Sequence, residues 1–228
     1  MSIDKLKEMG FNLIPLKPKS KEPIGGLNWK QFQDNKYMGS YPDSCNVAVI
    51  CGTSSGNIFV VDLDDTTLYD DYPEEIKNTF TVKTGKGYHI YYHFHGFPPP
   101  NKKLDDKRGR HIDIKSHGGY VLAPTSVHPN GSIYTAINES PIMDISIQKL
   151  KEHLSNMGFN VETKPVEEIE GGISEGGRND ATFKYACHLI REKGLFGEAL
   201  KLEIDNLNQR HTPPLPESEL SLIISQAE

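Results

Sequence analysis

Short apolar runs separated by turn residues fill the first two thirds of the chain, and this pattern predicts strands. The runs 46–52 and 57–64 flank a Thr-Ser-Ser-Gly turn, which favours a hairpin between them. A second pair of strands is expected over 81–94, about the turn Gly85-Lys86-Gly87. Single strands are predicted at 11–16, 111–115, 120–124 and 132–137, and short helices at 3–9 and 29–37.

From Ile147 onwards the apolar residues recur at helical spacing instead. One helix is predicted over 147–157, and Gly158 follows as its stop. Residues 159–178 are acidic, rich in glycine and poor in large apolar side chains, which is typical of a linker. Further helices are predicted around 183–190, 200–207 and 220–227.

Together these patterns predict an α+β protein with a separate helical part. We expect a mixed domain over 1–158, a linker over 159–178 and a small helical module over 179–228. The last apolar stripe reaches the final residue without a cap, so this module is expected to continue in a longer protein.

Composition and charge narrow the class of protein. The 228 residues include 36 % hydrophobic and 25 % charged residues, an ordinary mixture for a globular domain. No apolar run approaches the length of a membrane span, the first residues lack a signal-peptide pattern, and three cysteines are too few for a disulfide framework. We therefore expect a cytoplasmic protein without membrane contact. The net charge of −6 argues against a surface that binds nucleic acid everywhere, but it permits a local basic track.

The strongest chemical signal lies where the run 57–64 ends in VVDLDD. Side chains alternate along a strand, so Asp62 and Asp64 point to the same face. Two neighbouring carboxylates repel each other, and a bridging divalent cation such as Mg²⁺ or Mn²⁺ relieves that repulsion. The simpler alternative is a strand that ends in an acidic, solvated turn.

The segment VVDLDDT is compatible with two chemistries. It matches the D-x-D-x-T motif of haloacid-dehalogenase-type phosphatases, in which Asp62 would be the covalent nucleophile and Asp64 the general acid. It is also similar to the first metal-binding motif of archaeo-eukaryotic primases, in which both aspartates would hold metal ions for nucleotidyl transfer. Motifs elsewhere in the chain are needed to distinguish these two chemistries.

Two further segments carry polar residues that suit a site for metal ions and a triphosphate. In KTGKGYH, Lys86 lies between two glycines and His89 follows on the next strand, so both can donate to phosphate oxygens. An ordinary hairpin turn beside a packed histidine is the alternative. Asp113 projects from the apolar strand IDIK and would complete a set of three carboxylates with the first motif. Its alternative role is an ion pair with Arg110 or Lys115.

A basic segment over 101–115 includes this strand. Within it, Lys102, Lys103 and Arg108 are candidates for contacts with a nucleic-acid backbone. Aspartates interrupt the run, and a solvated charged loop has the same composition. Arg178, at the start of the helical part, is a further candidate for DNA binding.

The order and spacing of these motifs resemble the bifunctional DNA primase/polymerase (prim-pol) family of the archaeo-eukaryotic primase superfamily. The likeness begins with GFNLIPLKPKSKEP and continues through NVAVICGTSSGNIFVVDLDD, GYH and IDIKSHGGYVLAPTSVHPNG, so it covers about residues 8–140. The helical part resembles a primase C-terminal module, with GGRND at its start and PPLPESEL near its end.

The resemblance implies an RRM-like catalytic palm with an N-terminal α/β unit, followed by a small helical bundle. It implies that Asp62, Asp64 and Asp113 are metal ligands and that His89 contacts nucleotide phosphates, with Lys115 nearby. Two Mg²⁺ or Mn²⁺ ions would be the cofactors, and single-stranded DNA, a primer and nucleoside triphosphates the partners. No zinc is expected, because the cysteines are few and the histidines over 93–128 are interpreted as surface and strand residues. The protein would serve a plasmid or virus, with a helicase domain downstream.

Two alternative functions are weaker. The phosphatase needs the first strand of a parallel sheet, whereas a hairpin is predicted before the acidic motif. A module that binds a template or replication origin without catalysis conflicts with the complete set of acidic residues. We therefore predict a nucleotidyl transferase that makes and extends primers on single-stranded DNA.

Overall fold

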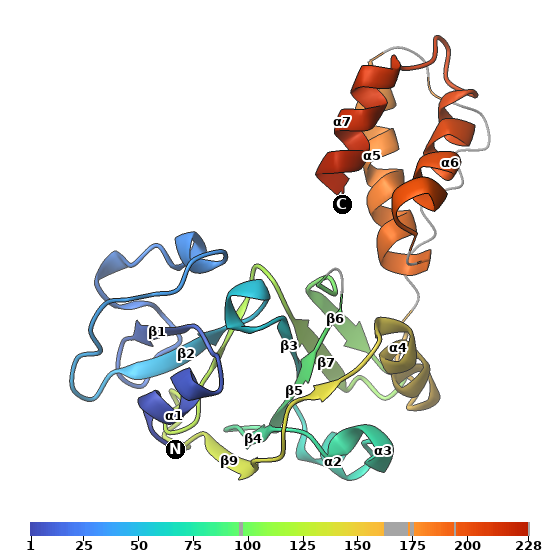
Figure 1. Cartoon of the computed structure of the whole chain (residues 1–228). Coiled ribbons are helices and arrows are strands. Elements are labelled where there is room, and N and C mark those ends of the chain that lie inside the picture. Colours follow the sequence, from blue (N-terminus) through green and yellow to red (C-terminus); the bar gives the residue numbers. More distant parts are fainter. Residues whose placement is uncertain (96–97, 162–172, 174–175, 194, 228) are drawn as a thin grey trace. The chain divides into compact units, whose positions relative to one another are not determined.

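The computed structural model describes residues 1–95, 98–161, 173, 176–193 and 195–227. The chain divides into two compact units, Met1–Val161 and Glu162–Glu228. The first unit contains antiparallel sheets and helices and the second is helical, which confirms the α+β class (Figure 1). None of the described helices is long and apolar enough to cross a membrane. Most of the predicted linker, 159–178, lies outside the described residues.

The larger of two sheets carries the acidic motif at its centre. Its strand order is β6 (Lys102–Asp105), β7 (His111–Lys115), β3 (Ile58–Leu63), β5 (Tyr88–His93), β4 (Thr81–Lys83) and β9 (Thr135–Asn138), and β10 (Met143–Asp144) pairs with β5. Neighbours along this order are antiparallel, and only the short β10 runs parallel to its partner. The strand pair predicted over 81–94 is therefore confirmed as β4 and β5.

A smaller sheet joins β1 (Leu13–Leu16), β2 (Asn46–Ile50) and β8 (Tyr120–Leu122), and α1 (Ile3–Glu8) packs beside it. The predicted hairpin between 46–52 and 57–64 is wrong, because β2 pairs with β1 and β8 whereas β3 pairs with β5 and β7. The two runs share one bridge, between Gly52 and Ile58. Gly52 has a φ of 108°, which glycine adopts readily, and the chain turns there from one sheet into the other.

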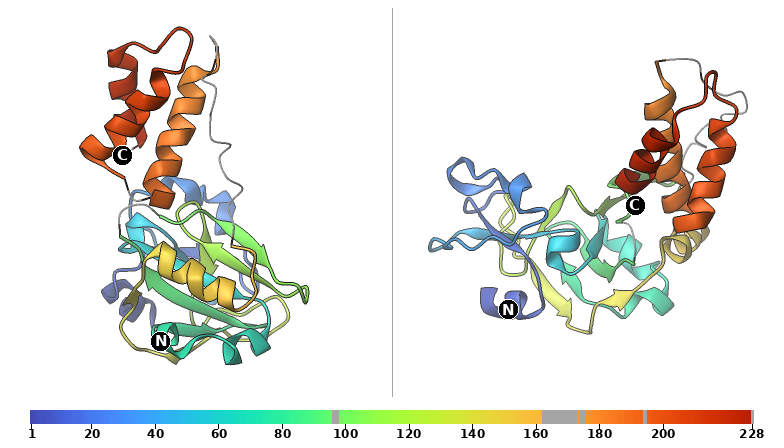
Figure 2. Two further views of the ribbon diagram at one scale, coloured as in Figure 1. Left: turned by 90° about the vertical axis from the view of Figure 1, so that its right-hand side faces the viewer. Right: turned by 45° about the horizontal axis from the view of Figure 1, so that its top comes forward.

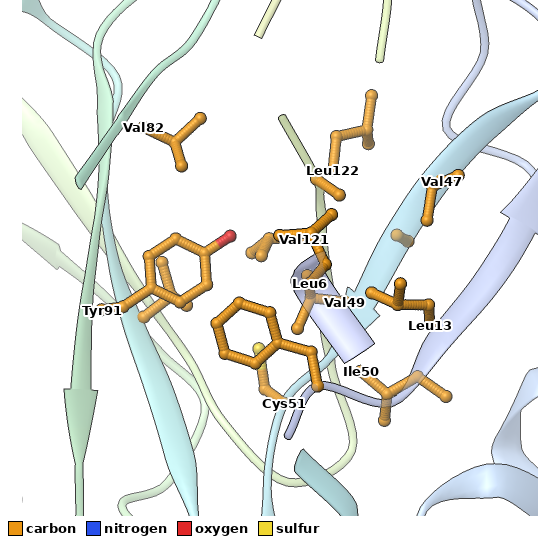
Figure 3. Packing of buried hydrophobic residues seen from close by; sticks show 14 of the residues in the cluster. Leu6, Leu13, Val47, Val49, Ile50, Cys51, Val82, Tyr91, Val121 and Leu122 are labelled. Atoms are coloured by element: carbon orange, nitrogen blue, oxygen red, sulfur yellow. The ribbon is translucent and has the colours of Figure 1, made fainter. Parts of the chain in front are cut away.

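Strand β3 separates two apolar cores. On one face, Ile58 and Val60 pack towards the smaller sheet. Figure 3 shows this packing, with Tyr91 and Val82 of the larger sheet directed towards Val121 and its neighbours. The next residue on this face of β3 is Asp62, where the apolar cluster ends. The alternation of side chains along one strand thus places the acidic motif at the open end of a buried face.

The other face of the larger sheet is covered by three helices. These are α2 (Thr66–Asp70), α3 (Glu74–Lys77) and α4 (Ile147–Asn156), and they contribute Leu68, Ile76, Leu150 and Leu154 to the second core. Figure 2 shows α4 lying across the sheet. The helix predicted over 147–157 is therefore confirmed. Phe159 falls in the predicted linker, yet it is 3 % exposed and belongs to the same core.

Several short elements differ from the sequence predictions. The helices α2 and α3 and the strands β6 and β10 were not expected, and the helix predicted over 29–37 is only a 3-10 turn at Trp29–Phe32. Strand β6 lies inside the segment interpreted as a charged loop. Leu104 is its one buried side chain, between exposed Lys103 and Asp105, and a single apolar residue gives no readable period.

The described residues of the second unit form three helices, α5 (Arg178–His188), α6 (Gly197–Asn208) and α7 (Glu217–Ala227), with a π-helical turn at Leu189–Lys193. All three predicted helices are thus present. The Asn208 side chain donates to the Leu215 carbonyl at 3.0 Å and accepts from the Leu215 amide at 2.7 Å, so it holds the proline-rich connection before α7.

Candidate active site

The strand register brings the predicted acidic residues together at the centre of the larger sheet. Asp62 on β3 lies opposite His89 on β5 and opposite Asp113 on β7. Side chains directly opposite each other on neighbouring strands share a face. The Asp62 carboxylate therefore has an imidazole on one side and a second carboxylate on the other.

Each carboxylate of this group has a basic neighbour. The distances are 3.4 Å between His89 Nε2 and Asp62 Oδ1, 2.7 Å between His111 Nε2 and Asp64 Oδ2, and 3.0 Å between Lys115 Nζ and Asp113 Oδ2. The ion pair of Asp113 with Lys115, which was the alternative interpretation, is present. Arg110 instead pairs with Asp71 and Asp106, outside the group.

Burial dominates the electrostatics of Asp62 and His89. It raises the pKa of the Asp62 carboxyl, while His89 counteracts this effect and Asp64 reinforces it. Burial also lowers the pKa of His89, in spite of the carboxylate beside it. Both side chains are therefore driven towards their neutral forms, and a cation placed at Asp62 would favour its ionised form again.

Four of the predicted site residues line one pocket of about 130 Å³: Asp62, Asp64, Lys86 and His89. Asp113 and Lys115 lie on the adjacent strand β7 and are not part of the described lining. The pocket is thus acidic on the β3 side and basic on the side of the β4–β5 turn. This charge separation suits a ligand that combines metal ions with phosphates.

The β4–β5 turn is held tightly against β3. A Cβ atom at Gly87 would overlap the carbonyl oxygen of Leu63 and lie 2.8 Å from its carbonyl carbon and 3.1 Å from the Asp65 nitrogen. The turn is closed by Thr84, whose Oγ1 accepts from the Gly87 amide at 2.9 Å. The glycines were expected to allow close approach to a ligand, and in this structure Gly87 allows close approach to the strand that carries the acids.

Sequence reasoning missed four residues at this site. Lys21, His128 and Tyr134 line the pocket, and His111 contacts Asp64. Two of these histidines had been interpreted as surface or strand residues. The signals were weak, since Lys21 lies in a lysine- and proline-rich loop and His128 in a turn, where no periodicity shows which way a side chain points.

The predicted DNA-binding residues occupy different positions. Lys103 lies opposite Asp113, so it shares the face of the acids, whereas Lys102 lies opposite Ile114 and shares the apolar face. Arg108 is exposed in the turn between β6 and β7. Arg178 lies in the other unit, where its guanidinium donates to the carbonyl of Pro213.

Whether metal ions suit this site depends on its donor set. Among the described residues, no three His, Cys, Asp or Glu side chains converge as a ready-made cage for an ion. Mg²⁺ does not require one, because it is usually held by one or two carboxylates together with waters and substrate phosphates. Asp62 and Asp64 on one pocket wall, with Asp113 next to Asp62 in register, are a donor set of this kind.

Two families match this chain. Residues 4–150 match the family described as bifunctional DNA primase/polymerase, N-terminal, and residues 167–225 match the family described as primase C terminal 1. Together the two domains indicate a DNA primase/polymerase, which acts on DNA and nucleotides. The first match spans more than half of the chain, and the chain belongs to the bifunctional DNA primase/polymerase family. No curated protein matches it.

Proposed function

We propose that this protein joins nucleotides on a single-stranded DNA template by a two-metal mechanism, making primers and extending them during replication of a plasmid or virus. The observation that carries the proposal is the register of β5, β3 and β7, which sets His89, Asp62 and Asp113 side by side on one face. Four antiparallel strands in the order β7, β3, β5 and β4, with helices over one face, support an RRM-like palm.

In the proposed reaction a primer 3′-hydroxyl attacks the α-phosphate of a nucleotide and pyrophosphate leaves. Asp62, Asp64 and Asp113 would hold two Mg²⁺ or Mn²⁺ ions, which would activate the hydroxyl and neutralise phosphate charge when bound. Lys86 and His89 would orient the triphosphate from the opposite wall of the pocket, and Lys115 would hold the Asp113 carboxylate in position.

The direct test measures incorporation of labelled nucleotides on single-stranded DNA with Mg²⁺ or Mn²⁺, with and without a primer. Product is expected both with and without the primer. Product only with a primer would limit the activity to extension. No product in either lane, from protein that is folded and binds the template, would favour the module that binds DNA without catalysis.

The phosphatase alternative conflicts with the sheet. Both neighbours of β3 are antiparallel to it, whereas that mechanism requires a strand within a parallel sheet. We therefore expect no phosphate release from a generic aryl phosphate.

Replacing His89 with alanine should mainly weaken nucleotide binding. His89 is 4 % exposed, lines the pocket and approaches Asp62, so its loss removes a contact with phosphate and a neighbour of the buried carboxylate. We expect the KM for the nucleotide to rise about tenfold, as for the loss of one hydrogen bond to a charged group, with a smaller change in kcat. Steady-state kinetics at saturating primed template measures both. An unchanged KM would contradict the phosphate contact.

Lys103 and Lys102 offer a matched pair for the template contact. Lys103→Ala should weaken binding of single-stranded DNA and reduce the slope of log K against log salt by about 0.7, the value for one phosphate contact on a single strand. Lys102→Ala should change neither, since Lys102 lies on the apolar face and its Nζ approaches the Val161 carbonyl at 3.5 Å. Fluorescence anisotropy with labelled DNA at several salt concentrations tests this. Equal effects of the two substitutions would exclude a role for the sheet face.

A further inference from the structure

Part of the lining of the pocket at Asp62 comes from two loops outside the acidic motif and its neighbouring strands. Lys21 comes from the loop after β1, and His128 comes from the loop that precedes β9. Both side chains line the pocket together with Asp62 and Asp64. Two loops that leave strands of the smaller sheet, one after β1 and one after β8, therefore take part in the site.

A buried asparagine fixes both loops. Asn46, which is 2 % exposed, is the first residue of β2. Its Nδ2 donates to the carbonyls of Ser20 at 2.9 Å and Val127 at 2.7 Å, and its Oδ1 accepts from the Val127 amide at 2.8 Å. Since Ser20 precedes Lys21 and Val127 precedes His128, one side chain holds the backbone directly before each pocket residue.

Lys21 brings a positive charge to the pocket from a fixed backbone. Its carbonyl accepts from the Tyr120 hydroxyl at 2.7 Å, so the loop is tied down on both sides of the residue. The Lys21 side chain thus lines the same pocket as Asp62 and His89.

His128 is oriented as a hydrogen-bond donor. Its Nδ1 accepts from the Asn130 amide at 3.2 Å, which in the neutral ring leaves the proton on Nε2. The ring of Tyr134 is close to both histidines of the pocket, with its centroid 6.2 Å from that of His128 and 5.5 Å from that of His89. Gly85 lets the β4–β5 turn approach, because a Cβ there would lie 3.1 Å from His128 Cγ.

We propose that Lys21 and His128 bind the β- and γ-phosphates of the incoming nucleoside triphosphate. The terminal phosphates carry most of its negative charge, and these two donors line the same pocket as Asp62 and Asp64, beside which the α-phosphate would lie for the reaction. The loops of the smaller sheet would then distinguish a triphosphate from a monophosphate. This inference rests on the proposed function, since it assumes that the pocket takes a nucleotide.

Equilibrium binding tests the inference without requiring catalysis. Dissociation constants of a nucleoside triphosphate and of the matching monophosphate are measured with Mg²⁺ for the native protein and for Lys21→Ala, Lys21→Arg, His128→Asn and Lys30→Ala. Lys30 is an exposed lysine of the same region that is not part of the described pocket lining, so its variant controls for net charge. Asparagine at 128 can still accept the Asn130 amide but lacks the Nε2 proton.

Lys21→Ala and His128→Asn should each weaken triphosphate binding about tenfold and leave monophosphate binding unchanged. Lys21→Arg should retain most of the affinity, and Lys30→Ala all of it. The inference is overturned if Lys21→Ala behaves like Lys30→Ala, if both nucleotides weaken equally, or if only DNA binding changes. A native protein that binds the triphosphate but incorporates no nucleotide would overturn the proposed function alone.

Discussion

Replacing Asp62 with asparagine should abolish nucleotide incorporation and leave the protein folded. Asparagine keeps the size of the side chain but removes its negative charge. In the proposed site that charge, on the strand between those of His89 and Asp113, would hold a metal ion. Loss of one preorganised electrostatic group at a reacting centre costs about a hundredfold to a thousandfold in rate, and a lost metal ligand should cost at least as much. The incorporation assay measures the loss directly, and Asp113→Asn should behave in the same way.

The same substitution should not lower stability. Burial raises the pKa of Asp62, because the ionised carboxylate is less stable inside the folded protein than in water. The Asp62 carboxyl therefore stays protonated to a higher pH in the folded protein than in the unfolded chain. In the absence of divalent ions, the native protein should lose stability relative to Asp62→Asn as the pH rises above the ordinary carboxyl pKa of about 4. Thermal melts at acidic and neutral pH measure the difference. Added Mn²⁺ should raise the melting temperature of the native protein only.

Asp65 supplies a matched control. It lies three residues further along and caps α2, accepting from the Thr67 amide at 2.8 Å. Asparagine caps a helix about as well as aspartate, so Asp65→Asn makes the same chemical change with the cap preserved. Its activity should be close to native. Full activity in Asp62→Asn, or equal loss in Asp65→Asn, would contradict the assignment of the site.

Replacing Gly87 with alanine should damage both stability and activity. The added methyl group would overlap the carbonyl oxygen of Leu63, and that oxygen belongs to the backbone, so the turn or the strand has to move. Overpacking of this kind costs about 1–3 kcal/mol or more. For a protein of this size each kcal/mol lowers the melting temperature by about 2–4 °C.

The loss of activity should exceed what the loss of stability explains. Leu63 lies between Asp62 and Asp64, and a displacement of about 1 Å at a reacting centre can cost a hundredfold in rate. Gly85→Ala, two residues earlier, meets only the His128 and Asn130 side chains at 3.1–3.3 Å and should be milder in both respects. Incorporation measured well below the melting temperature of each variant separates the two effects. Native behaviour of Gly87→Ala would show that the turn can withdraw from β3.

The sequence indicated which face of its strand each acidic side chain occupies, because strand periodicity governs that orientation. Asp62 and Asp64 follow an alternating pattern, so their shared face could be inferred without a structure. Asp113 interrupts an apolar strand, but its place beside Asp62 depends on the pairing of β7 with β3. The hairpin predicted between 46–52 and 57–64 is wrong because periodicity gives no information there. Strands β2 and β3 are buried on both faces, and such strands read as continuous apolar runs that do not reveal their partners.

The remaining wall of the pocket could not be predicted, because it depends on loops. Lys21 and His128 are placed by hydrogen bonds from Asn46, a residue that in the sequence is only the polar start of a strand. No spacing rule links residues 21, 46 and 128. Family resemblance supplied the identity of the domains and the proposed roles of the acidic residues, and it was silent on these contacts.

The pairing of β8 with β2 has a consequence for how the protein is made. Residues 120–122 complete a sheet whose other strands are residues 13–16 and 46–50, so the beginning of the chain stays unfinished until the middle has left the ribosome. Such long-range pairing is slow and leaves apolar surface exposed meanwhile. The lining of the pocket extends along the chain from Lys21 to Tyr134, so a nascent chain that ends before Tyr134 lacks part of it. If the pocket takes a nucleotide as proposed, that nucleotide can bind only after the two sheets have been joined.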